Sequence, residues 1–213
     1  MNKSVLITRP NHDLATTYLC WWSEKVIDKC LEKKIRHFDL KGKKASKKNF
    51  DSCLKKNNPS FIFINGHGSL EAVTGWDNKI LLRVGDKLDV KNRIIYARSC
   101  MAGVKLGRVC VHFGAKAFIG YTKNYMLLFL TNKKTRPLMD NLAGLFLRPS
   151  NSIPISLVEG KTTGEADQKS KDLMIKNLKR ILSSNKNGKK EVASYLWHDI
   201  KYQVVIGNNL AKI

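Results

Sequence analysis

Four short apolar runs restrict most strongly what this chain can fold into. They are SVLIT (4–8), SFIFIN (60–65), RIIYA (93–97) and KAFIGY (116–121). Each run is continuous rather than alternating, which is typical of strands that are buried on both faces of a parallel sheet. Segments with helical spacing lie between them, so the sequence predicts an α/β fold: a mostly parallel sheet sandwiched between helices.

The intervening segments carry apolar residues at helical intervals. After the turn PNHD, apolar residues at 19, 22, 26 and 30 recur at steps of three and four, which predicts one helix with an apolar face. Further helices are expected over 46–57, 103–114, 138–147, 165–184 and 190–198. Strands are expected at 35–40 and 202–207, and a hairpin or loop excursion at 73–86.

The length of 213 residues predicts one domain, 1–213, with one core and a less regular segment at about 122–152. The apolar run before Arg9 is too short for a signal peptide, and MLLFL (126–130) is too short to cross a bilayer. We therefore expect a cytoplasmic protein with no membrane partner.

The net charge of +22 is unusually high. Such a charge attracts nucleic acid, anionic surfaces or acidic proteins. It also fits a lysine-rich, solvated surface, because no aromatic residues alternate with the lysines as stacking platforms for bases. Both interpretations stay open.

The chain has five cysteines and no CxxC pair, which argues against a disulfide framework and against a zinc site. No metal site is expected. Four of the cysteines lie in helical or apolar contexts and are interpreted as small buried hydrophobes: Cys20, Cys30, Cys53 and Cys110. Cys100 differs because of its position.

Cys100 and His67 each follow the end of an apolar run, in ARSCMAG and NGHGS. Ligands of open α/β sheets bind beyond the carboxyl ends of the strands. A helix beginning directly after Cys100 would lower the pKa of its thiol. His67 would serve as the base, and the backbone N–H groups of Gly68 and Cys100 could stabilise an oxyanion. Redox sensing is disfavoured, since Cys110 lies about 15 Å further along the helix axis.

The blocks FIFINGHGS and IIYARSCMAG resemble the caspase-like cysteine peptidases, which include caspases, metacaspases, gingipain, separase and the CHAT domains. Segments 114–122, 158–166 and 202–208 are also similar to CHAT and gingipain-like chains. The resemblance implies a caspase-like three-layer sandwich and a cysteine endopeptidase with His67, Cys100 and the amides of Gly68 and Cys100 in its site. It implies no cofactor, although calcium dependence stays possible, and it implies a peptide substrate and an activating or regulatory protein.

In this family the loop after the first strand and the residue two before the cysteine help to shape the substrate pocket. Arg9 and Arg98 occupy these places and would suit a substrate carboxylate, which predicts cleavage after acidic residues. Alternatively, Arg98 points away into an ion pair and Arg9 merely ends a strand. Asp13, Glu71, Asp77 or Asp86 could equally supply an acidic pocket. An activating cut could fall in the basic loop 131–137.

A second hypothesis is an inactive caspase-like module that binds nucleic acid or an acidic partner through its basic surface. Binding of that kind would fall steeply with salt and would survive replacement of Cys100.

Overall fold

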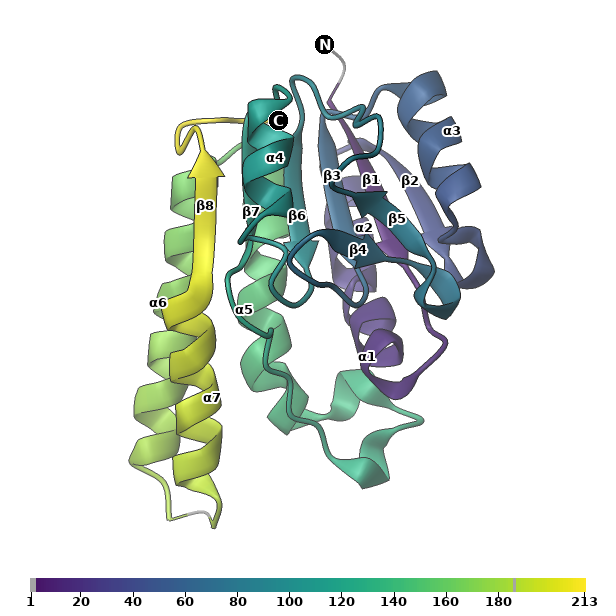
Figure 1. Cartoon of the computed structure of the whole chain (residues 1–213). Coiled ribbons are helices and arrows are strands. Elements are labelled where there is room, and N and C mark those ends of the chain that lie inside the picture. Colours follow the sequence, from purple (N-terminus) through teal and green to yellow (C-terminus); the bar gives the residue numbers. More distant parts are fainter. Residues whose placement is uncertain (1–2, 186) are drawn as a thin grey trace.

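The computed structural model describes residues 3–185 and 187–213, and its centre is a six-stranded sheet (Figure 1). The strand order is β2-β1-β3-β6-β7-β8, with β8 antiparallel to β7 and the other pairs parallel. The strands are β1 (Ser4–Arg9), β2 (Arg36–Lys41), β3 (Phe61–Asn65), β6 (Ile94–Arg98), β7 (Ala117–Tyr121) and β8 (Gln203–Gly207).

Helices cover both faces of this sheet, which confirms the three-layer α/β sandwich. One face packs against α2 (Glu24–Glu32), α5 (Asn141–Val158) and α6 (Thr163–Leu182). The other packs against α3 (Lys47–Asn57), α4 (Leu106–His112) and a hairpin of β4 (Ala72–Thr74) and β5 (Ile80–Arg83). The remaining helices are α1 (Leu14–Trp22), which contacts α5, and α7 (Lys189–Tyr202), which packs on α6.

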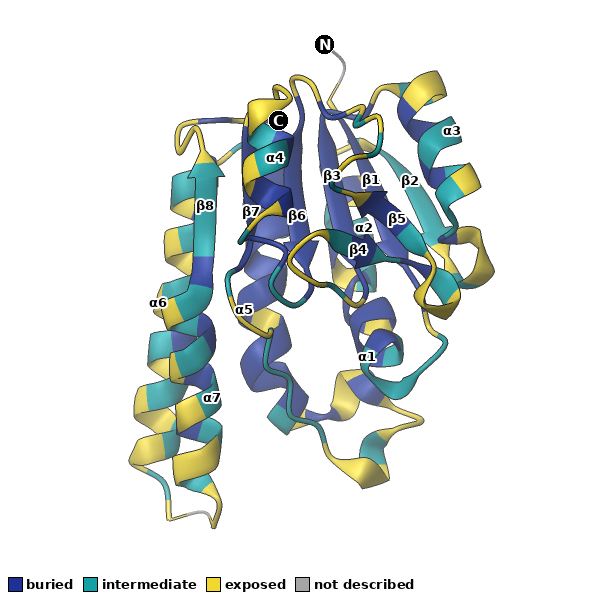
Figure 2. Cartoon of the chain, in the orientation of Figure 1, coloured by how far each residue is buried: buried dark blue, intermediate teal, exposed yellow. Residues whose placement is uncertain are grey.

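The central strands are buried along their whole length, as their continuous apolar runs predict. Every residue of β1, β3, β6 and β7 is buried, and Figure 2 shows these strands in dark blue between the helical layers. Side chains alternate between the two faces: Phe61 and Phe63 join one core cluster, and Ile62 and Ile64 join the other.

The helix predicted across residues 19–30 is two helices, α1 and α2, which meet at Ser23. The Ser23 hydroxyl donates a hydrogen bond of 2.7 Å to the Leu19 carbonyl and also accepts one from Arg98. A serine that bonds back to the carbonyl four residues earlier tends to bend a helix. The predicted single helix was therefore wrong.

The less regular segment is shorter than expected, because α5 begins at Asn141 and continues through Pro149 and Pro154. A proline inside a helix leaves the carbonyl four residues earlier without its amide donor. For Pro149 that carbonyl belongs to Leu145, and Asn177 of α6 donates to it at 2.8 Å. Tertiary contacts of this kind are not visible in the local sequence.

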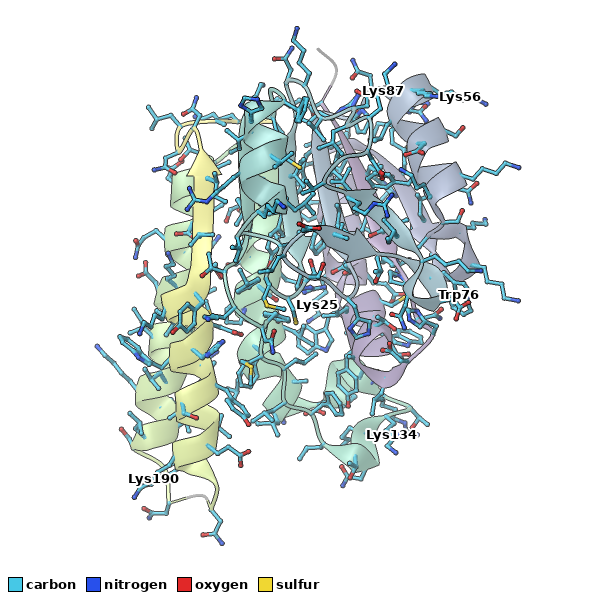
Figure 3. The ribbon with its side chains drawn as sticks, viewed as in Figure 1. Lys25, Lys56, Trp76, Lys87, Lys134 and Lys190 are labelled. Atoms are coloured by element: carbon cyan, nitrogen blue, oxygen red, sulfur yellow. The ribbon has the colours of Figure 1, made fainter. Side chains whose placement is uncertain are left out.

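Basic side chains are spread over the surface. Lys56 and Lys87 lie at one end of the view in Figure 3, and Lys134 and Lys190 lie at the opposite end. All four are exposed. In the part of the chain that the structure describes, no helix combines the length and apolar character needed to span a bilayer.

Candidate active site

The register of two neighbouring strands brings the His67 and Cys100 segments together. Asn65, the last residue of β3, pairs with Arg98, the last residue of β6. His67 and Cys100 each follow two residues after this pair. Both therefore lie at the carboxyl edge of the sheet, where the parallel strands end, toward α1 in Figure 1.

Close backbone approach explains the two glycines that flank His67. A Cβ on Gly66, whose φ is +155°, would lie 2.1 Å from the Thr74 carbonyl oxygen of the hairpin. A Cβ on Gly68 would lie 2.6 Å from the carbonyl oxygen of Cys100. Real Cβ atoms do not approach so closely. A larger residue at position 66 would push the histidine loop away from the hairpin, and one at position 68 would push it away from the cysteine loop.

Asp13 holds the His67 ring. Nε2 of His67 lies 2.7 Å from Oδ2 of Asp13, and the histidine side chain is 47% exposed. Asp13 is also the N-cap of α1 and accepts a hydrogen bond of 2.7 Å from the Thr16 amide. Partial burial opposes ionisation of Asp13, but the bonds from Thr16 and His67 outweigh it and lower the pKa of this carboxyl.

Sequence reasoning considered Asp13 only as a substrate-pocket residue and missed its pairing with His67. The available signal was an aspartate at a helix N-cap directly after β1, because β1 is the neighbour of β3 in the sheet.

Cys100 is partly exposed, whereas the other four cysteines are buried. The expectation that a helix begins directly after it was wrong: α4 begins at Leu106, and Met101 has a φ of +55°. The helix N-terminus therefore does not lie at the thiol. Burial instead raises the pKa of Cys100 and nearby Asp199 raises it further, while the Tyr125 backbone N–H, which bonds to the sulfur, acts in the opposite direction.

The two amides predicted to form an oxyanion hole are available. Neither the Gly68 N–H nor the Cys100 N–H donates a hydrogen bond to another atom of residues 3–185 or 187–213. The carbonyl that precedes the Gly68 N–H is engaged, since the His67 oxygen accepts from the Thr74 amide at 2.9 Å. An open hollow of about 370 Å³ adjoins this loop and is lined by His67, Gly68, Ser69, Ala72, Thr74 and Asn78.

The structure corrects the proposed pocket roles of Arg9 and Arg98. Arg98 is fully buried, and its five N–H groups donate to five internal acceptors. Arg9 is 4% exposed and forms a bidentate pair with Asp39 and a further ion pair with Glu24. These bonds hold both side chains inside the fold, away from a substrate.

One group of side chains could hold a metal ion. Donor atoms of His12, Asp13 and His67 lie within 4.8 Å of one another. The sequence analysis expected no metal site, because it considered the cysteines alone.

Comparison with solved structures shows the fold. The chain matches the Arg-specific cysteine proteinase gingipain R (RgpB) with a TM-score of 0.64 and 12% identity, over 100% of this chain and 48% of that one. It also matches a complex of Porphyromonas gingivalis RgpB pro- and mature domains, with a TM-score of 0.58 and 13% identity, over 98% of this chain and 48% of that one. The chain thus has a caspase-like fold and spans about half the length of these neighbours. A scan of known family models finds no match, and neither does a search of curated proteins.

Proposed function

We propose that this protein is a cysteine endopeptidase in which Cys100 is the nucleophile and His67 the general base. The observation that carries the proposal is the meeting of three features at one sheet edge: a partly exposed thiol, an imidazole held by a carboxylate, and two backbone amides that donate no hydrogen bond within residues 3–185 and 187–213. The likeness in fold to a cysteine proteinase supports the same class of reaction.

The first half of the reaction forms a thioester. Asp13 occupies Nε2 of His67, so Nδ1 is the nitrogen that accepts the Cys100 proton as the sulfur attacks the peptide carbonyl. The Gly68 and Cys100 amides donate to the oxyanion of the tetrahedral intermediate. The protonated His67 then gives its proton to the departing amine, and the C–N bond breaks.

The second half regenerates the thiol. Water enters where the amine has left, His67 accepts one of its protons, and the resulting hydroxide attacks the thioester. The C–S bond breaks, the carboxylic acid product leaves, and Cys100 recovers a proton from His67. Asp13 stabilises the imidazolium in both halves and fixes the tautomer of the neutral ring.

Because the pKa of Cys100 is raised, the thiol is protonated at rest and proton transfer accompanies attack. His67 thus acts as a true base during attack and does not hold a preformed thiolate. Since Arg9 and Arg98 are buried, they do not support a preference for acidic residues.

A peptide-library cleavage assay tests this proposal. Cys100→Ala and His67→Ala should abolish cleavage, and Cys100→Ala should abolish labelling by a thiol-reactive peptide ketone. Cys53→Ala, at a buried cysteine in α3, is the matched control and should cleave like the wild type. Cleavage by the Cys100→Ala protein at the wild-type rate would place the reaction elsewhere.

The library should be profiled with and without calcium, and before and after limited proteolysis. The segment 131–137, where we propose an activating cut, is mostly exposed. The complex of RgpB pro- and mature domains supports an activating or regulatory protein partner for this chain.

The charge of +22 supports a second candidate, binding of nucleic acid or an acidic protein by an inactive scaffold. This candidate predicts binding to duplex or single strands that falls steeply with salt and is unchanged in Cys100→Ala. Absence of binding at low salt would eliminate it for nucleic acid.

A further inference from the structure

Three side chains that include the proposed base have the composition of a transition-metal site. His12 and Asp13 come from the loop between β1 and α1, and His67 comes from the loop after β3. Two imidazoles and one carboxylate suit Zn²⁺ and its chemical relatives, whereas Ca²⁺ and Mg²⁺ prefer oxygen ligands alone. Cys100 does not belong to this set.

Two separations between donor atoms can be compared with the geometry of such an ion. Around a tetrahedral Zn²⁺, neighbouring N and O ligands lie roughly 3.3 Å apart, as bond lengths of about 2.0–2.2 Å require. Nε2 of His12 lies 3.4 Å from Oδ2 of Asp13, close to this value. Nε2 of His67 lies only 2.7 Å from the same oxygen, because a hydrogen bond joins them. The metal would replace that proton and widen the gap by a fraction of an ångström.

Two of the three ligands are already fixed in place. The Thr16 amide and hydroxyl hold Asp13 as the cap of α1. The His12 side chain is only 11% exposed, and its ring packs edge-on against Trp76 with centroids 5.6 Å apart. The more exposed His67 is the ligand that can adjust. Preorganised donors lower the cost of binding an ion.

The surroundings also indicate how tightly the ion would be held. Oδ1 of Asn78 lies 3.2 Å from Nε2 of His12, and Asn78 lines the hollow beside His67, so water or a neutral oxygen can complete the coordination. Nδ1 of His12 is buried and has no hydrogen-bond partner in the described part of the chain. A ligating histidine without a partner for its second nitrogen binds more weakly. We therefore expect weaker, reversible binding than at a site whose ligating histidines all have partners for their second nitrogen.

We propose that His12, Asp13 and His67 bind one Zn²⁺ ion and that this ion reversibly inhibits the enzyme. The inhibitory role rests on the proposed peptidase function, whereas the metal site does not. A neutral imidazole that ligates the metal through Nε2 keeps its one proton on Nδ1, so His67 can no longer accept the Cys100 proton there. The same event withdraws Asp13 from His67. The thiol then loses its base while remaining unmodified.

Binding is tested with untagged full-length protein by titration with Co²⁺, followed by visible absorption, and with Zn²⁺, followed by calorimetry. The Cys100→Ala background removes the reactive thiol. The Cys100→Ala protein should bind one equivalent of Co²⁺ or Zn²⁺. Its cobalt spectrum should lack the intense charge-transfer band of a cobalt thiolate. Adding His12→Ala or the more conservative His12→Gln should weaken binding at least tenfold. His112→Ala, at a histidine of α4 outside the cluster, should leave binding unchanged.

Inhibition is tested separately by peptide cleavage. Zn²⁺ should inhibit the wild type at the concentration that half-saturates the site, and EDTA should restore activity. Measured against its own zinc-free rate, His12→Ala should require at least tenfold more Zn²⁺ for half-inhibition. Equal metal affinity in the His12 and His112 variants would overturn the site, and Zn²⁺ binding without inhibition would overturn its role. Cobalt binding by a protein that cleaves no peptide supports the site and contradicts the peptidase.

Discussion

Arg98 provides a demanding test of how β6, the strand that leads to Cys100, is held in place. It is fully buried, and it donates to Asn65, Ser150, Asn151, Leu19 and Ser23 over distances of 2.8–3.2 Å. No carboxylate is among these acceptors, so neutral oxygens solvate the charge. Its guanidinium also lies 5.1 Å from the centre of the Phe63 ring.

Arg98→Met removes all five bonds and keeps an apolar side chain about as long as the aliphatic part of arginine. Each buried acceptor left without a donor costs about 1 kcal/mol or more. Removing a buried charge returns part of this sum, since its desolvation cost disappears. We expect a net loss of about 3–5 kcal/mol, because five acceptors lose a donor and the recovered desolvation offsets only part of that cost. Because whole domains are stable by only about 5–15 kcal/mol, this loss is large.

The assay is equilibrium urea denaturation followed by circular dichroism. Arg98→Lys keeps the charge but has only three donors, so it should fall between the wild type and Arg98→Met. Arg108→Met, at an exposed position of α4, is the matched control and should stay within about 0.5 kcal/mol of the wild type. A loss below about 1 kcal/mol in Arg98→Met would refute the view that this network holds β6 in place.

Three further outcomes are expected. Burial raises the pKa of Cys100, so iodoacetamide should alkylate it more slowly at pH 7 than it alkylates a free-cysteine peptide. The alkylation rate should still increase above pH 9, and a rate that levels off below pH 7 would contradict this. Burial also raises the pKa of Asp199 well above its ordinary 3.8, so the folded protein keeps a proton on this carboxyl that the unfolded chain loses. The free energy of unfolding should therefore decrease as the pH rises above 3.8. In urea denaturation, the stability of Asp199→Asn relative to the wild type should therefore increase from pH 4.5 to pH 8. A stability difference that does not change with pH would exclude this titration. Asn177→Ala leaves the Leu145 carbonyl without a donor and should lower the free energy of unfolding by about 1 kcal/mol, as measured by thermal or urea unfolding. An unchanged unfolding midpoint would show that water replaces the amide.

The strands and the placement of the two candidate site segments could be predicted from the sequence. Runs such as FIFIN and IIYAR are apolar at every position, and the parallel arrangement that such runs require places their ends at one edge. The glycine after His67 was also informative, because the backbone passes close to the cysteine loop there.

The direction of individual polar side chains could not be predicted. Whether Arg98 faces a substrate or the interior depends on α5 and on the α1–α2 junction, which are far away in sequence. The path of the chain from Cys100 to Leu106 depends on a positive φ at Met101, a residue type that gives no local signal for it. The pairing of Asp13 with His67 depends on how two loops approach each other.

Asp13 both caps α1 and contacts His67, so its role in folding can be separated from its role in the proposed catalysis. Serine, threonine or asparagine at this position would still cap the N-terminus of α1, since these residues are good N-caps. None of them would carry the negative charge that faces His67. A single base change can convert an aspartate codon to an asparagine codon. Descendants of this chain could therefore lose turnover in one step and persist as intact scaffolds, free to acquire other work.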